Sequence, residues 1–296
     1  MRRLTLTLSA IAIASTLIVM TVPAHASAPA SCAATRTPAN FRACITKATA
    51  AYTALWAPSI AMHGGGAVPP TIRIPQGVAL NPCFDATVGD VAVASFWCNK
   101  NTSVYVSAFA APYWTREYTR SAKEQGVLAS DAKKLHRTQK RLLRGYPNQG
   151  AATELAHELG HWVQTEVGID EWYATRAEGD TDVAGAYAAA GEFAADCMAG
   201  WVQGRAAAVG AWKNTPFIRW ASRATIAELG GLPEPMKPGF VFPKDTTFYA
   251  HGESWSRLKL YNQGWTLGVR GDDGITGCAN AAAAITGTPA PPIPVA

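Results

Sequence analysis

The sequence lacks several features that would assign it to a common class of protein. None of its 6 cysteines forms a C-x-x-C pair, which argues against a cysteine-bound zinc site. Its 296 residues contain no internal repeat, so no repeat architecture is predicted. The formal net charge of +5 is too small to indicate a particular charged partner. The basic run at 133–144 has no interleaved aromatic residues, so nucleic-acid binding is not predicted either.

Long apolar runs are missing beyond the N-terminus, so no membrane span is predicted in the mature chain. Residues 1–26 combine Arg2 and Arg3 with an apolar run over 4–22 and the small-x-small sequence Ala24-His25-Ala26. This order is typical of a cleaved secretory signal peptide. It predicts a secreted or extracytoplasmic protein, with an uncleaved membrane anchor as the alternative.

The cysteines all lie beyond the predicted signal peptide and are even in number. Export favours disulfide formation, although the sequence alone leaves the connectivity open. The simplest pairings join near neighbours and leave the last two cysteines to each other. The expected pairs are Cys32–Cys44, Cys83–Cys98 and Cys197–Cys278.

Hydrophobic periodicity predicts an α+β chain with a hydrophobic fraction of 48%, enough for a sizeable core. Turn residues 99–101 separate two alternating segments, which indicates a β-hairpin. We expect a single domain over 27–285, followed by a proline-rich tail at 286–296 that does not pack. The expected helices cover 37–62, 115–145, 183–209 and 255–268, and the expected strands cover 71–75, 91–98 and 102–109.

The segment ATELAHELGHWVQTEVG, residues 152–168, contains an H-E-x-x-H motif formed by His157, Glu158 and His161. In a helix, side chains four residues apart lie on the same face, so both histidines can bind one metal ion. A histidine in a helix is more often a packing residue. Here, however, the apolar residues of the segment gather on the opposite face, which favours a zinc site.

A catalytic zinc ion normally has three protein ligands, so the motif needs one more. The acidic residues between 170 and 182 lie among glycine, threonine and other acids, and we expect them to be exposed loop charges. Glu192 and Asp196 instead share one face of the alanine-rich helix. Because an unpaired buried charge is costly, two carboxylates on such a face indicate a buried partner. We expect Glu192 to bind zinc and Asp196 to orient a ligating histidine.

Three ordered segments, HELGHWVQ, GEFAADCMAGW and HGESWSRLKLYNQGWTLG, resemble the putative neutral zinc metallopeptidase family of bacteria. The resemblance covers about residues 56–278. It implies a zincin-like α+β fold with Glu192 as third ligand, and it favours His251 over Tyr249 as the donor to the oxyanion. It also implies that the strand TSVYVS, 102–107, borders the cleft and pairs with an extended peptide. Trp162 departs from the family pattern, in which many members have a second consecutive histidine.

These features predict a secreted zinc metallopeptidase that hydrolyses peptide bonds in a peptide or protein substrate. One Zn²⁺ per chain would be held by His157, His161 and Glu192, and Glu158 would act as general base. Two alternatives use the same residues. One is a zinc amidase acting on cell-wall amides, and the other is a non-catalytic secreted protein in which zinc has four protein ligands.

Overall fold

The structure is a computed structural model. It describes residues 32, 37–74, 83, 95–106, 146–178, 181–215, 218–219, 222–223, 225–226 and 254–295. Within these residues the chain forms six helices, one short 3-10 helix and a three-stranded sheet, so the predicted α+β class is confirmed. The predicted signal peptide and the basic segment at 115–145 lie outside the described residues.

The sheet is small and its strands lie in the order β1-β3-β2. β1 (Thr71–Arg73) pairs in parallel with β3 (Ser103–Tyr105), and β2 (Phe96–Cys98) pairs with β3 in antiparallel fashion. The 3-10 helix η1 (Asn99–Asn101) joins β2 to β3, which confirms the predicted hairpin. β3 is bonded on both sides over its whole length. The expectation that this strand pairs with an extended substrate peptide is therefore wrong for Ser103–Tyr105.

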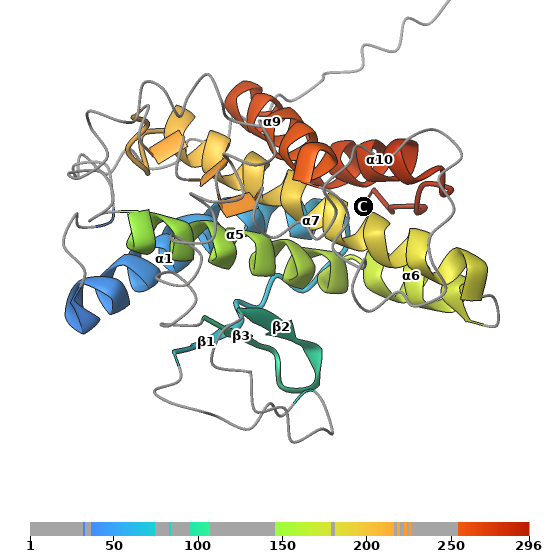
Figure 1. Ribbon diagram of the computed structural model, residues 1–296, viewed down its shortest axis with the longest axis horizontal. Coiled ribbons are helices and arrows are strands. Elements are labelled where there is room, and N and C mark those ends of the chain that lie inside the picture. The colour runs from blue at the N-terminus through green and yellow to red at the C-terminus, as the bar shows by residue number, and fades with distance from the viewer. Residues whose placement is uncertain are drawn as a thin grey trace, which may run out of the picture.

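The helices pack in layers on one side of the sheet (Figure 1). α5 lies next to β2 and β3, and α7 packs against its other side, with α9 and α10 beyond α7. α1 runs beside α5, and α6 packs against both α5 and α7. The helices are α1 (Pro38–Met62), α5 (Tyr146–Glu166), α6 (Ile169–Ala177), α7 (Thr181–Ala208), α9 (Ser254–Arg270) and α10 (Gly274–Thr286).

The predicted first helix forms because its ends and its buried face agree with the sequence. Thr37 Oγ1 accepts a hydrogen bond from the Asn40 backbone N–H at 3.1 Å, and Pro38 occupies the first turn, where its missing N–H costs nothing. The side chains at helical spacing from Phe41 to Ile60 are buried. Among them Trp56 stacks on Trp201 of α7, with ring centroids 4.2 Å apart.

α5 is the central element of the molecule. Every residue from 148 to 160 is buried, polar ones included, because the sheet, α1 and α7 surround this part of the helix. A helix that is buried all round must give its polar side chains partners inside the protein. One example is Thr153 Oγ1, which donates to the Ser222 hydroxyl at 2.9 Å.

The structure contains three disulfides, and they are the pairs expected from the sequence. Cys32–Cys44 anchors the residues that precede α1, and Cys83–Cys98 is attached to the end of β2. Cys197–Cys278 joins α7 to α10, with the alpha carbons 5.3 Å apart. The two cysteines of this bond are 81 positions apart in sequence.

Two sequence-based expectations need correction. The acidic stretch after residue 168 is not a loop, since residues Ile169–Ala177 form α6 with Ile169 and Tyr173 buried. The proline-rich tail does pack: Ile293 lies against the core, and the Pro294 carbonyl accepts a hydrogen bond from His63 Nδ1 at 2.6 Å. The proline-rich composition wrongly predicted a tail that does not pack, because the burial of only a few of its residues is enough to hold it against the core. The domain limits themselves remain a prediction.

Among the described residues, no helix combines the length and the apolar character needed to cross a membrane.

Candidate metal centre

The centre lies where α5 and α7 approach each other. α5 contributes His157 and His161, whose rings are perpendicular with centroids 4.9 Å apart, and α7 contributes Glu192. Gly160 makes the approach possible. A Cβ at this position would lie 2.9 Å from the Ala195 alpha carbon, closer than real side chains tolerate. The contact between these small residues of α5 and α7 thus sets the distance between the histidines and the carboxylate.

Three side chains with possible ligand atoms converge at this point. His157 Nε2 lies 3.2 Å from Glu192 Oε2, and His161 Nε2 lies 3.5 Å from Glu192 Oε1. One ligand atom from each of these three residues can be chosen so that all lie within 4.8 Å of one another, and they are the only such group among the described residues. Zinc bonds of about 2.1 Å in tetrahedral geometry place ligand atoms roughly 3.4 Å apart. The three side chains therefore fit a zinc ion.

Asp196 fixes the orientation of the first histidine. Its Oδ1 atom lies 2.9 Å from His157 Nδ1, so the carboxylate accepts the N–H at this nitrogen and leaves Nε2 directed at Glu192. This is the usual arrangement around a ligating histidine, in which a carboxylate holds the ring nitrogen that does not bind the metal. Glu192 and Asp196 of α7 thus have different surroundings.

Sequence reasoning assigned no role to Arg257, although this residue lies in the third of the quoted segments. Its guanidinium is fully buried and contacts Asp196 twice, with Nε 2.6 Å from Oδ2 and Nη2 2.8 Å from Oδ1. Nη2 also lies 3.8 Å from Glu192 Oε2. Arg257 thereby neutralises a fully buried aspartate, which would otherwise be very costly. The only sequence feature that could have drawn attention to Arg257 was its position as an arginine near the start of a helix with many aromatic and aliphatic residues.

Carboxylates on α7 raise the pKa of both histidines. Burial alone would lower the pKa of His157, but the Asp196 and Glu192 carboxylates raise it to about 10. Burial likewise opposes the shift at His161, and Glu192 raises the pKa of that ring above its ordinary value. The site therefore attracts positive charge. A bound metal cation can compensate the negative charge of these carboxylates, as a proton on a histidine does.

Glu158 is buried next to the two histidines but does not belong to the three-residue group. Glu154 lies one helical turn before it and accepts a hydrogen bond from Ser95 Oγ at 2.7 Å. Burial raises the pKa of Glu154 to about 7, although the Ser95 hydroxyl opposes this rise. A Glu154 carboxyl that keeps its proton near neutral pH adds less negative charge beside Glu158.

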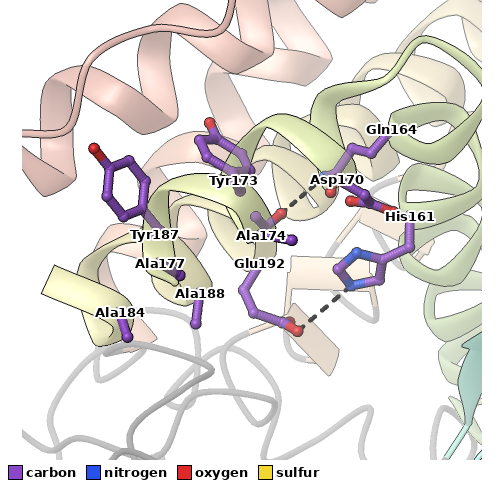
Figure 2. Close-up of a pocket in the computed structure, with 11 residues that line it drawn as sticks. His161, Gln164, Asp170, Tyr173, Ala174, Ala177, Ala184, Tyr187, Ala188 and Glu192 are labelled. Carbon is purple, nitrogen blue, oxygen red and sulfur yellow. Dashed lines mark hydrogen bonds and ion pairs between the residues drawn. The ribbon is translucent and has the colours of Figure 1, made fainter. Parts of the chain in front are cut away.

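A pocket of about 340 Å³ adjoins the centre between α5, α6 and α7 (Figure 2). His161 and Glu192 form part of its wall, so the pocket and the metal centre share two side chains. Asp170, expected to be an exposed loop charge, is a half-buried pocket residue on α6 and accepts a hydrogen bond from Thr165 Oγ1 at 2.6 Å. That expectation is wrong because the stretch is helical and turns this carboxylate toward α5.

The proposed oxyanion donors, His251 and Tyr249, lie outside the described residues. The structure therefore places four of the expected site residues around one point and Glu158 beside them. Those four are His157, His161, Glu192 and Asp196.

Comparison with known families adds an independent finding. Residues 132–272 match the family model described as Putative neutral zinc metallopeptidase. Over this segment the chain is similar to that zinc peptidase family. The match confirms the resemblance seen in the sequence motifs, and it includes the whole of α5, α6, α7 and α9. Comparisons with curated proteins and with solved structures gave no match.

Proposed function

We propose that this protein is a secreted zinc metallopeptidase, with zinc bound by His157, His161 and Glu192. The observation that carries the proposal is the convergence of these three side chains within 4.8 Å, with Glu158 beside the group but not part of it. Three protein ligands leave one position for water and substrate, as in catalytic zinc sites. Similarity to a zinc metallopeptidase family supports the same metal and the same reaction class.

The bound zinc would polarise the scissile carbonyl and acidify the attacking water. Glu158 accepts a proton from this water and passes it to the leaving amine. Asp196, which is itself held by Arg257, orients the ring of His157 so that its Nε2 atom stays directed at the site. His251, within the family-matched segment, is the proposed donor to the developing oxyanion, with Tyr249 as the alternative.

Export is part of the proposal because two features support it. The first is the signal-like sequence of residues 1–26. The second is the set of three disulfides, which form and persist mainly in oxidising compartments.

The decisive experiment combines metal analysis with an activity screen of the purified mature protein. We expect about one zinc per chain and hydrolysis of unstructured protein such as casein. Glu158→Gln should retain the zinc while hydrolysis falls by a factor on the order of 10² or more, since a positioned base contributes that much.

Three results would contradict parts of this proposal. Loss of zinc in the Glu158→Gln variant would make Glu158 a ligand. Release of peptidoglycan fragments without any cleavage of casein would favour the amidase alternative. Stable zinc binding with no hydrolysis of either substrate would favour a structural metal site.

A further inference from the structure

We propose that the pocket beside the metal centre binds a cationic side chain of the substrate, lysine or arginine, with Asp170 as its ionic partner. As a substrate subsite, this inference rests on the proposed function. The pocket is placed for that role because His161 and Glu192 line it at one end, so a side chain within it belongs to a residue close to the scissile bond.

The walls of the pocket suit a long, thin side chain. On α6 the lining residues recur at helical spacing from Asp170 to Ala177, and on α7 from Ala184 to Glu192. Most of them are alanine or glycine, which leaves the volume open, and two tyrosines, Tyr173 and Tyr187, add aromatic surface. The methylene groups of lysine or arginine can pack on these alanine and tyrosine side chains while the charged end stays polar.

The polar atoms of the pocket favour a positive guest. Within the described part of the chain, the Asp170 carboxylate has a hydrogen bond from Thr165 and no ion pair with lysine or arginine. Burial raises the pKa of Asp170, although the His161 ring and the Thr165 hydroxyl oppose this rise, so burial is only partly compensated at the ionised carboxylate. A lysine ammonium or arginine guanidinium beside it would supply the missing charge.

Gln164 helps to shape the pocket. Its Nε2 atom donates to the Gly191 carbonyl at 2.8 Å, which fixes the amide, and its Oε1 atom is buried. A neutral apolar guest would leave the Asp170 carboxylate without an ionic partner, and an anionic guest would be repelled by it. A cation with N–H donors pairs with this carboxylate.

Calorimetric titration of the mature, zinc-loaded protein with two small probes tests the inference without relying on hydrolysis. The probes are Nα-acetyl-lysine methylamide and the norleucine analogue, which lacks the charge. We expect the lysine probe to bind at least about 10-fold more tightly, since a charge-assisted hydrogen bond contributes more than 1.4 kcal/mol. Equal or tighter binding of the norleucine probe, or no measurable binding of the lysine probe, overturns the inference.

Two variants of α6 sharpen the test. Asp170→Asn should remove the preference for lysine, whereas Glu171→Gln, which changes the exposed neighbouring acid, should keep it. Zinc content and thermal unfolding show whether each variant is folded, and the wild-type comparison of the two probes stands without them. Persistence of the lysine preference in folded Asp170→Asn also overturns the inference.

Cleavage of a peptide mixture separates the two proposals. If the lysine probe binds selectively but no peptide is cleaved, the pocket assignment stands and the proposed function fails. If peptides are cleaved with no enrichment of lysine or arginine beside the cut bond, the proposed function stands and the pocket assignment fails.

Discussion

At the scale of single residues, the carboxylates of Glu192 and Asp196 on α7 differ in what they contact. Glu192 lies within 3.2 Å and 3.5 Å of the Nε2 atoms of His157 and His161. Asp196 is fully buried between His157 Nδ1 and the guanidinium of Arg257. Both oxygens of Asp196 are therefore engaged by His157 and Arg257, whereas the oxygens of Glu192 face the Nε2 atoms of the two histidines.

Substitutions should separate these roles. Glu192→Ala should lose zinc outright, whereas Asp196→Asn should weaken zinc affinity by roughly 10- to 100-fold, as changes behind a ligating histidine do. Asp196→Asn should also lower the melting temperature, because it leaves the Arg257 guanidinium buried with less compensation. Competition with a zinc chelator measures the affinity. Glu178→Ala, at an exposed acid, is the control and should bind zinc normally; zinc loss there with retention in Glu192→Ala would refute the assignment.

At the scale of the elements, α7 and α9 pack at unusually short range through glycines on both helices. A Cβ at Gly200 would overlap the Tyr261 carbonyl, and one at Gly264 would overlap the Cys197 carbonyl. The close contact matters for the site because α9 carries Arg257, which must reach Asp196 on α7.

Gly200→Ala should therefore separate the two helices and destabilise the protein by about 1–3 kcal/mol or more, the usual cost of overpacking. Gly191→Ala is the matched control on the same helix, since its Cβ would meet atoms only at 3.8 Å and beyond. The control should be neutral or slightly stabilising, because alanine has the higher helix propensity by about 1 kcal/mol. Thermal or urea unfolding compares the variants; equal stability of the two would show that the glycine contact is not tight.

At the scale of the whole molecule, the Cys197–Cys278 disulfide joins α7, which carries Glu192 and Asp196, to α10. Cys197 directly follows Asp196, and both cysteines are fully buried. In the chain-entropy model, a bond that closes 81 positions contributes about 4.5 kcal/mol, against about 3 kcal/mol for Cys32–Cys44, which closes 12.

Replacing Cys197 and Cys278 by alanine should therefore lower the unfolding free energy more than replacing Cys32 and Cys44. It should also weaken zinc binding, because the lost bond adjoins Asp196. Chemical unfolding and chelator competition measure the two effects. Peptide mapping of the unreduced protein checks the pairing itself, and a Cys197 peptide linked to any cysteine other than Cys278 would contradict it.

The sequence by itself determined the features that depend on local spacing. The positions of His157 and His161 follow from helical geometry, because residues four apart share a face whatever surrounds them. The same holds for α1, whose apolar rhythm ends before a Gly/Pro-rich stretch, and for the hairpin around Asn99–Asn101. Glu192 and Asp196 could be selected because two carboxylates on an alanine-rich helix require a partner.

Only the tertiary structure decided which groups meet across elements. Arg257 lies 61 positions after Asp196 in the sequence, and no local pattern reveals that its guanidinium contacts this carboxylate. The sequence predicted that Asp170 is an exposed loop charge. In the structure α6 packs against α5 and α7, and Asp170 lines the pocket between them. β3 became the central strand because β1 pairs with it from a distant part of the chain. Each of these depends on long-range packing, whose energy is shared among many residues and leaves no periodic signature in the sequence.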